Sequence, residues 1–169
     1  DRIEVQNISG RFPYPDRTGN FRMTRGWGHI QFSGILRKVY WDDTLADAFE
    51  LSGNATGWGI NVSTNIKFNE KKDTLRGSVV YGEGIENYMN DAPVDIGIES
   101  NPGNAITPVT GTPLPVFGLV AFYDHTWNEK FTSTIGYSRV DITNSDLQTA
   151  DAFKSGQYAL VNFLIYPVK

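Results

Sequence analysis

Apolar and polar side chains alternate along GWGINVSTNIKFNEKKDTLRGSVVYGEG, residues 57–84. Successive side chains of a β-strand point to opposite faces, so an alternating stretch predicts a strand with one apolar and one polar face. The charged residues 70–73 interrupt the alternation and predict a turn. One parity on both sides of this turn is apolar: Trp58, Ile60, Val62, Ile66, Phe68, Leu75, Val79 and Tyr81.

The same kind of pattern recurs along the chain and predicts about seven strands in a single segment spanning residues 1–169. Several expected strands are about 10–12 residues long, whereas ordinary strands have about 5–6 and a membrane crossing needs about 9–11 tilted residues. No convincing helix is expected, although 44–51 could form a turn or two. The expected strands are 2–11, 28–39, 57–68, 74–83, 116–127, 131–140 and 157–166.

The connections between these strands differ in length. Those at 69–73 and 128–130 are short and polar, whereas 41–56, 86–115 and 141–156 are long and rich in Asn, Asp, Gly and Pro. Short turns at one end of a sheet and long loops at the other are typical of outer-membrane β-barrels. The segment FPYPDRTGNFRMTRG departs from this rule, because it is expected as a long excursion on the short-turn side.

The alternation also predicts how the first hairpin pairs. Phe68 is expected opposite Leu75 on the apolar face, and Lys67 opposite Arg76 on the polar face. Two cations facing one another are tolerable on a surface that lines water, and they would suit an anionic solute.

In the next hairpin, a three-residue loop at 128–130 places Trp127 opposite Phe131. A two-residue loop would instead move Asp124 to the apolar face, so the longer loop is preferred. Aromatic residues then lie near both ends of the apolar band, as in the aromatic girdles of membrane barrels.

Two hypotheses for the fold are consistent with these features. The first is an antiparallel up-and-down transmembrane β-barrel, with its apolar face toward lipid. The second is a soluble, secreted β-sandwich that buries its apolar face and binds a ligand through its long loops. Solubility without detergent distinguishes the two readings.

Composition excludes some classes of function. The formal net charge is −4, from 15 Lys and Arg against 19 Asp and Glu, and no basic block is concentrated enough for a nucleic-acid partner. Without cysteine the chain has no disulfide and no thiolate metal site. No run of about 18 apolar residues, the length that a membrane helix requires, occurs in the sequence.

Catalytic motifs are also missing from the sequence. Neither His29 nor His125 belongs to a metal-binding spacing such as HExxH, and no G-x-S-x-G element occurs. The acidic residues of 42–50 and 141–151 do not follow the EF-hand pattern and are interpreted as solvated loops. We therefore expect no enzyme, no metal and no cofactor.

The polar face is the candidate functional surface. In a barrel it would line a water-filled lumen, where fixed charges determine which solutes enter. The residues expected to line the pore are Arg37, Lys67, Arg76, His29, Asn61, Asn65 and Asp124.

Four segments, which together cover about half of the chain, resemble the DcaP-like family of trimeric outer-membrane porins and occur in the same order as in that family. These segments are GNFRMTRGWGHIQFSGILRKV (19–39), TGWGINVSTNIKFNEKKDTLRGSVVYGEGIENYM (56–89), AFYDHTWNEKFTSTIGYS (121–138) and NFLIYPVK (162–169).

The resemblance implies a homotrimer of barrels, each with about 16 strands, in the bacterial outer membrane, in contact with lipid and lipopolysaccharide. It also implies a diffusion channel for small, often negatively charged organic solutes such as dicarboxylates. Arg37 and Arg76 match lumen positions of the family. Because single-chain bacterial barrels have an even number of strands, seven strands are expected to be a portion of a larger barrel.

Overall fold

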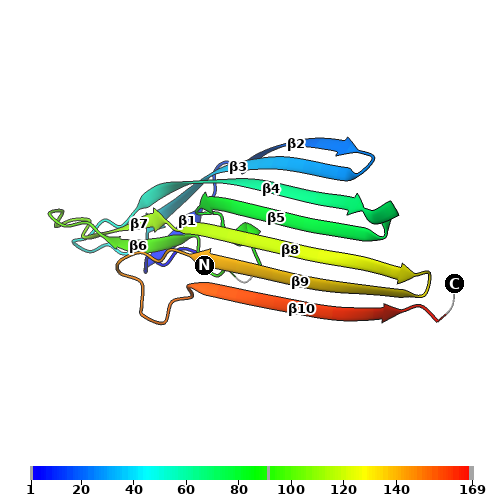
Figure 1. Cartoon of the computed structure of the whole chain (residues 1–169). Coiled ribbons are helices and arrows are strands. Elements are labelled where there is room, and N and C mark those ends of the chain that lie inside the picture. The colour runs from blue at the N-terminus through cyan, green and yellow to red at the C-terminus, as the bar shows by residue number, and fades with distance from the viewer. Residues whose placement is uncertain (1, 91, 168–169) are drawn as a thin grey trace.

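A computed structural model describes residues 2–90 and 92–167, so the last two residues of the NFLIYPVK segment lie outside it. The described residues form one large antiparallel sheet and one small two-stranded sheet (Figure 1). No helix among them is long and apolar enough to span a membrane. The strands are β1 (Ile8–Arg11), β2 (Arg17–Arg25), β3 (Gly28–Asp43), β4 (Gly53–Phe68), β5 (Asp73–Glu83), β6 (Ile96–Ser100), β7 (Val109–Pro113), β8 (Pro115–Asn128), β9 (Phe131–Ile142) and β10 (Ser155–Ile165), with short 3-10 turns η1 (Asn69–Lys71) and η2 (Glu86–Tyr88).

The large sheet has the order β1-β3-β4-β5-β8-β9-β10, and β2 also pairs with β3. Neighbouring strands are antiparallel, which confirms the expected all-β, antiparallel class. β1 and β2 share one edge, because β1 pairs with the end of β3 and β2 pairs with its beginning. Within the described residues the two edges of this sheet do not pair with each other, so the sheet is open.

The expected strand at 2–11 is only partly correct. Residues 8–11 form β1, but Asn7 has a left-handed φ of 56°, which interrupts the extended backbone before it. The preceding residues instead run beside β6, where Ile3 forms a parallel bridge with Ile96.

The segment expected as a long excursion contains β2, and that expectation was wrong. β2 pairs with β3 along its whole length, and only Gly26 and Trp27 connect the two strands. The next residue, Gly28, has a φ of +140° and lies where a Cβ would overlap the carbonyl of Asn65, so only glycine fits. Three short connections therefore lie at one end of the sheet, opposite the long loops (Figure 1).

The β4–β5 hairpin has a different register from the expected one. Phe68 lies opposite Asp73, and Arg76 lies opposite Asn65, not Lys67. The cause is the turn itself, because η1 places three residues with positive φ directly after Phe68 and closes the hairpin earlier. A two-residue slip preserves the faces, so the division into apolar and polar sides is confirmed.

The β8–β9 hairpin reaches the expected pairing by another route. Its turn holds only residues 129–130, and Asn128 pairs with Phe131. A β-bulge at Trp127 adds one residue to β8 and restores the register that a three-residue loop predicted. Tyr123 consequently pairs with Ile135, and Asp124 remains on the polar face.

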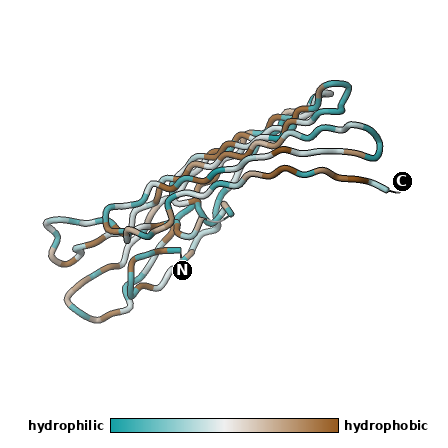
Figure 2. The backbone as a smooth tube through the Cα atoms, turned by 60° about the horizontal axis from the view of Figure 1, so that its bottom comes forward, coloured by the Kyte–Doolittle hydropathy of each residue, from teal (hydrophilic) through white to brown (hydrophobic). Residues whose placement is uncertain are grey.

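One face of the large sheet is apolar and largely uncovered. Its rows run across the strands, as in Ile66–Leu75–Tyr123–Ile135–Val161. Valines 62 and 79 on this face are 40% and 43% exposed, and no second sheet packs over it among the described residues. Apolar and polar residues alternate along the strands in Figure 2. The described residues therefore do not form a β-sandwich.

The buried core lies at the long-loop end of the sheet. One cluster packs residues near the N-terminus and β6 against the end of β3, around Trp41. A second cluster packs the chain between β5 and β8 against β8 and β9, around Ile85. The loop end is thus a packed body, whereas the strands beyond it form a single layer (Figure 1).

Candidate functional site

The polar face contains the predicted lining residues. His29, Asn65 and Arg76 form one row across β3, β4 and β5. Lys67 and Asp124 occupy the adjacent row, toward the short turns, where Thr74 lies between them. Five of the seven residues are therefore brought together on neighbouring rows.

Positive charge exceeds negative charge on this part of the face. The Nε atom of Arg76 lies 2.8 Å from Oδ2 of Asp124, and the Arg76 side chain remains 60% exposed. The Lys67 side chain is also exposed. Arg22, which sequence reasoning missed, lies on β2 with its guanidinium 3.1 Å from Nδ1 of His29. Asp124 is thus one carboxylate among three cationic side chains.

Asn61 lies farther toward the loops on the same face. Its side-chain amide donates to Oγ of Ser78 on β5 at 2.7 Å and to the carbonyl of Val79 at 3.3 Å. These two hydrogen bonds fix the orientation of the amide on the polar face. Asn61 is therefore an immobilised polar group without charge.

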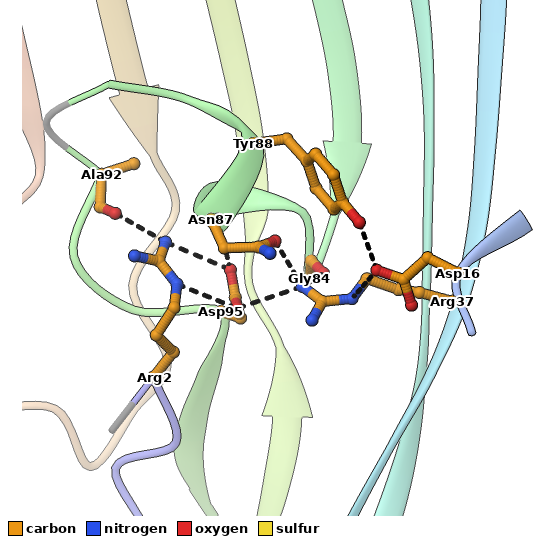
Figure 3. Close-up of polar contacts among 8 residues, drawn as sticks. All are labelled: Arg2, Asp16, Arg37, Gly84, Asn87, Tyr88, Ala92 and Asp95. Atoms are coloured by element: carbon orange, nitrogen blue, oxygen red, sulfur yellow. Dashed lines mark hydrogen bonds and ion pairs between the residues drawn. The ribbon is translucent and has the colours of Figure 1, made fainter. Parts of the chain in front are cut away.

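Arg37 lies on the expected face, but its side chain does not line open space. Its side chain is only 5% exposed, because the chain between β5 and β6 folds over it. We call residues 84–90 and 92–95 the inner segment. The Arg37 guanidinium contacts Asp95 at 3.1 Å and Asp16 at 3.4 Å, and it donates to the carbonyl of Gly84 (Figure 3). Its role is to anchor this segment to β3.

A polar network extends from Arg37 through the inner segment. Asp95 also receives hydrogen bonds from the Arg2 guanidinium, at 3.0 Å, and from the backbone N–H of Asn87, at 2.7 Å. On the other side, the Tyr88 hydroxyl donates to Asp16 (Figure 3). Because Asp95 is nearly fully buried and accepts several hydrogen bonds, the network fixes η2 to Arg37 of β3.

Glycines on the polar face allow the inner segment to approach closely. A Cβ on Gly118 would lie 2.5 Å from Cε of Met89, and a Cβ on Gly59 would overlap the end of the Ile85 side chain. Gly59 pairs with Gly82, so two neighbouring strands lack side chains at the same place. Ile85 fills this place and is 2% exposed. Glycines at these strand positions thus form a seat for the segment.

A hollow of about 1030 Å³ lies between the inner segment and the sheet. Asn20, Ser33 and Ser78 contribute to its wall from the sheet, and Tyr88 and Met89 from the segment. The polar-face side chains that line the hollow are uncharged. The one charged lining residue among those described, Arg139, lies on the apolar face of β9 and pairs with Asp141. The hollow is large enough for a small organic molecule.

Glu86 is the unusual residue of the inner segment. Its side chain is fully buried, and no side chain among the described residues hydrogen-bonds its carboxylate oxygens. Burial, and to a smaller extent the nearby Asp95, raises the pKa of Glu86 to about 8, and the backbone N–H groups of Glu86 and Ile85 oppose this shift only in part. At neutral pH this carboxyl is therefore mainly protonated.

The sequence contained one signal for the inner segment. Gly57, Gly59, Gly82 and Gly118 fall on the polar parity of expected strands, where glycine often marks a close approach of another backbone. The segment itself has no alternation, and nothing in its order of residues identifies Glu86 or Asp95 as buried. Their placement depends on the fold around them.

Comparisons with known proteins support the fold. No protein-family model matches the chain, and no curated protein matches it by sequence. Among solved structures, it is similar to the crystal structure of the outer membrane channel DcaP of Acinetobacter baumannii, with a TM-score of 0.73 and 19% sequence identity. The similarity covers 99% of this chain and 45% of that channel, so the chain spans less than half its length. At this identity the comparison establishes a shared fold, that of part of an outer-membrane channel.

Proposed function

We propose that this chain forms part of the wall of an outer-membrane porin through which small organic solutes diffuse. The observation that carries the proposal is the long antiparallel sheet with an uncovered apolar face and a polar face with charged rows. Such a sheet is suited to separate lipid from water. The similarity to an outer-membrane channel supports the same role.

The solutes are proposed to be anionic. Lys67, Arg76 and Arg22 outnumber Asp124 near the short-turn end of the polar face. Fixed charges that line a narrow aqueous path act locally on permeating ions and favour those of opposite sign. A small carboxylate would therefore enter more readily than a cation of the same size.

The inner segment is proposed to narrow the path. It lies over the polar face at the long-loop end, and the hollow beside it has uncharged, partly apolar walls. A solute would meet charge on one stretch of the wall and hydrogen-bonding and apolar groups on another. This combination favours organic anions over small inorganic ions, because an organic body can contact the apolar wall.

A closed barrel requires further strands beside this sheet. β2 and β10 both run toward the short-turn end, because seven strand positions alternate in direction between them. Each edge can therefore pair antiparallel only with a strand that runs toward the long loops. An odd number of added strands satisfies both edges, and the total is then even, as in bacterial single-chain barrels.

The remaining parts of the proposal rest on the resemblance noted from the sequence. The assembly is a homotrimer, and its environment is lipid and lipopolysaccharide. We also propose that the channel performs no catalysis and needs no cofactor, because the sequence lacks catalytic and metal-binding motifs.

Planar-bilayer recording tests this function. The purified protein, with the further strands that close the barrel, should insert and give stable, stepwise conductance, with a reversal potential that indicates anion preference in a salt gradient. Protein that remains monomeric in plain buffer and gives no conductance would instead indicate the soluble, ligand-binding alternative.

A further inference from the structure

Glu86 has no counter-charge of its own in the inner segment. The charged groups that influence it most are Asp95 and Arg2. The Arg2 guanidinium is already committed to Asp95 at 3.0 Å and to the carbonyl of Ala92 at 2.7 Å. An ionised Glu86 would therefore place a second carboxylate beside Asp95, away from water and without a free cation to pair with it.

The protonation state of Glu86 is consequently linked to docking of the segment. If the segment leaves the sheet, the carboxyl enters water and regains an ordinary pKa of about 4.5, against about 8 when docked. The docked state then holds more protons between these two values. Its extra stability is complete below about pH 4.5, decreases as the pH rises, and is absent above about pH 8.

We propose that protonation of the Glu86 carboxyl holds the inner segment against its glycine seat, so that the path is narrow in acid and wider at alkaline pH. The effect on the path depends on the proposed porin function. The pH-dependent docking of the segment, which we call the docking switch, follows from a buried carboxyl that has no free cation to pair with. It does not depend on the porin function.

Other titratable groups near the segment do not account for such a switch. The hydrogen bond from Tyr88 to Asp16 raises the pKa of the tyrosine above its usual value, so this hydroxyl stays neutral across the range. The other charged groups beside the segment are paired with one another: Arg2 with Asp95, and Arg37 with Asp16 and Asp95. Both histidines lie on the sheet toward the short turns, away from the inner segment.

Labelling of a buried cysteine measures docking directly. The natural chain has no cysteine, and Ala92 in the segment is 3% exposed, so Ala92→Cys introduces one small, protected thiol. Its reaction with a water-soluble maleimide is followed from about pH 5 to about pH 8.5 in the purified protein. Ala150→Cys, on an exposed loop, corrects for the ordinary pH dependence of the thiol.

The corrected labelling rate should rise with pH by up to about tenfold per unit and level off near pH 8, because one proton is linked to docking. In a Glu86→Gln background, which is neutral at every pH, the corrected rate should be flat. Glu86→Met serves the same purpose if the glutamine variant does not fold. A flat rate in the parent protein, or a pH dependence that persists without Glu86, overturns the proposal.

Single-channel conductance over the same pH range then tests the consequence. Conductance should rise with pH in the parent protein and change much less in Glu86→Gln. Conductance that falls as labelling rises would overturn the proposal that undocking widens the path. If labelling responds but no channel forms, the docking switch stands and the porin function fails.

Discussion

The Arg76–Asp124 pair is the best place to alter charge on the polar face. Replacing Arg76 with Gln removes one cation while its partner carboxylate remains, so anion preference should fall. Replacing Asp124 with Asn should raise it by the same reasoning. Reversal potentials in a salt gradient measure both shifts, and both should shrink at about 1 M salt, where the screening length is about 3 Å. Equal potentials for both variants at low salt would exclude this pair from the pore wall.

Arg37 should contribute mainly to stability. Arg37→Met removes a buried cation that contacts Asp16 and Asp95, and we expect a loss of about 3 kcal/mol in unfolding free energy. Arg11→Met is the matched control, because the Arg11–Asp42 pair is exposed and should be worth less than about 1 kcal/mol. Urea unfolding in lipid vesicles compares them, and equal losses would contradict an anchoring role.

Individual residues show what the sequence could and could not predict. The face of Val62 or Asn61 was predictable, because alternation in a strand depends only on parity and survives a two-residue slip. The burial of Arg37 was not, because it depends on a segment about 50 residues away in the chain that has no periodic pattern. The predicted pairing of Lys67 with Arg76 was wrong for a local reason: the residues of η1 have left-handed backbone conformations and close the hairpin two residues earlier.

At the scale of elements, the glycine seat makes a specific prediction about the inner segment. Gly59→Val should displace the segment, because the new side chain would overlap the buried side chain of Ile85. Gly34→Val, on β3 with nothing nearer than 3.8 Å, should be tolerated. Labelling of a cysteine at position 92 should increase many-fold in the first variant alone. Equal labelling in both would mean that the seat does not hold the segment.

Elements also differed in how well the sequence revealed them. The long strands with alternation were predictable, but β2 was not, because it is an exposed edge strand whose apolar residues are few: Phe21 and Met23. The β6–β7 hairpin is short and lies within a long loop, so no extended pattern identifies it. Both gained their structure from pairing partners, which local sequence does not encode.

At the scale of the whole molecule, the apolar face should be intolerant of charge in a membrane. Val62→Arg or Val79→Arg should cost roughly 2–4 kcal/mol of folding free energy in lipid if these paired residues lie near the midplane. Ser63→Arg, one residue along β4 and on the polar face, should cost much less. Unfolding in vesicles decides, and an equal cost at both positions would argue against lipid on one side.

The central claim is that this sheet separates lipid from water, with each side chain assigned to one or the other by parity. Cysteine substitution at each residue from 60 to 66, followed by labelling with a water-soluble thiol reagent in reconstituted membranes, tests it most directly. We predict protection at Ile60, Val62 and Ile66 and reaction at Asn61, Ser63 and Asn65. Equal labelling of the two sets of positions would contradict the account. Protection of Ile60, Val62 and Ile66 that persists in protein without membrane or detergent would also contradict it.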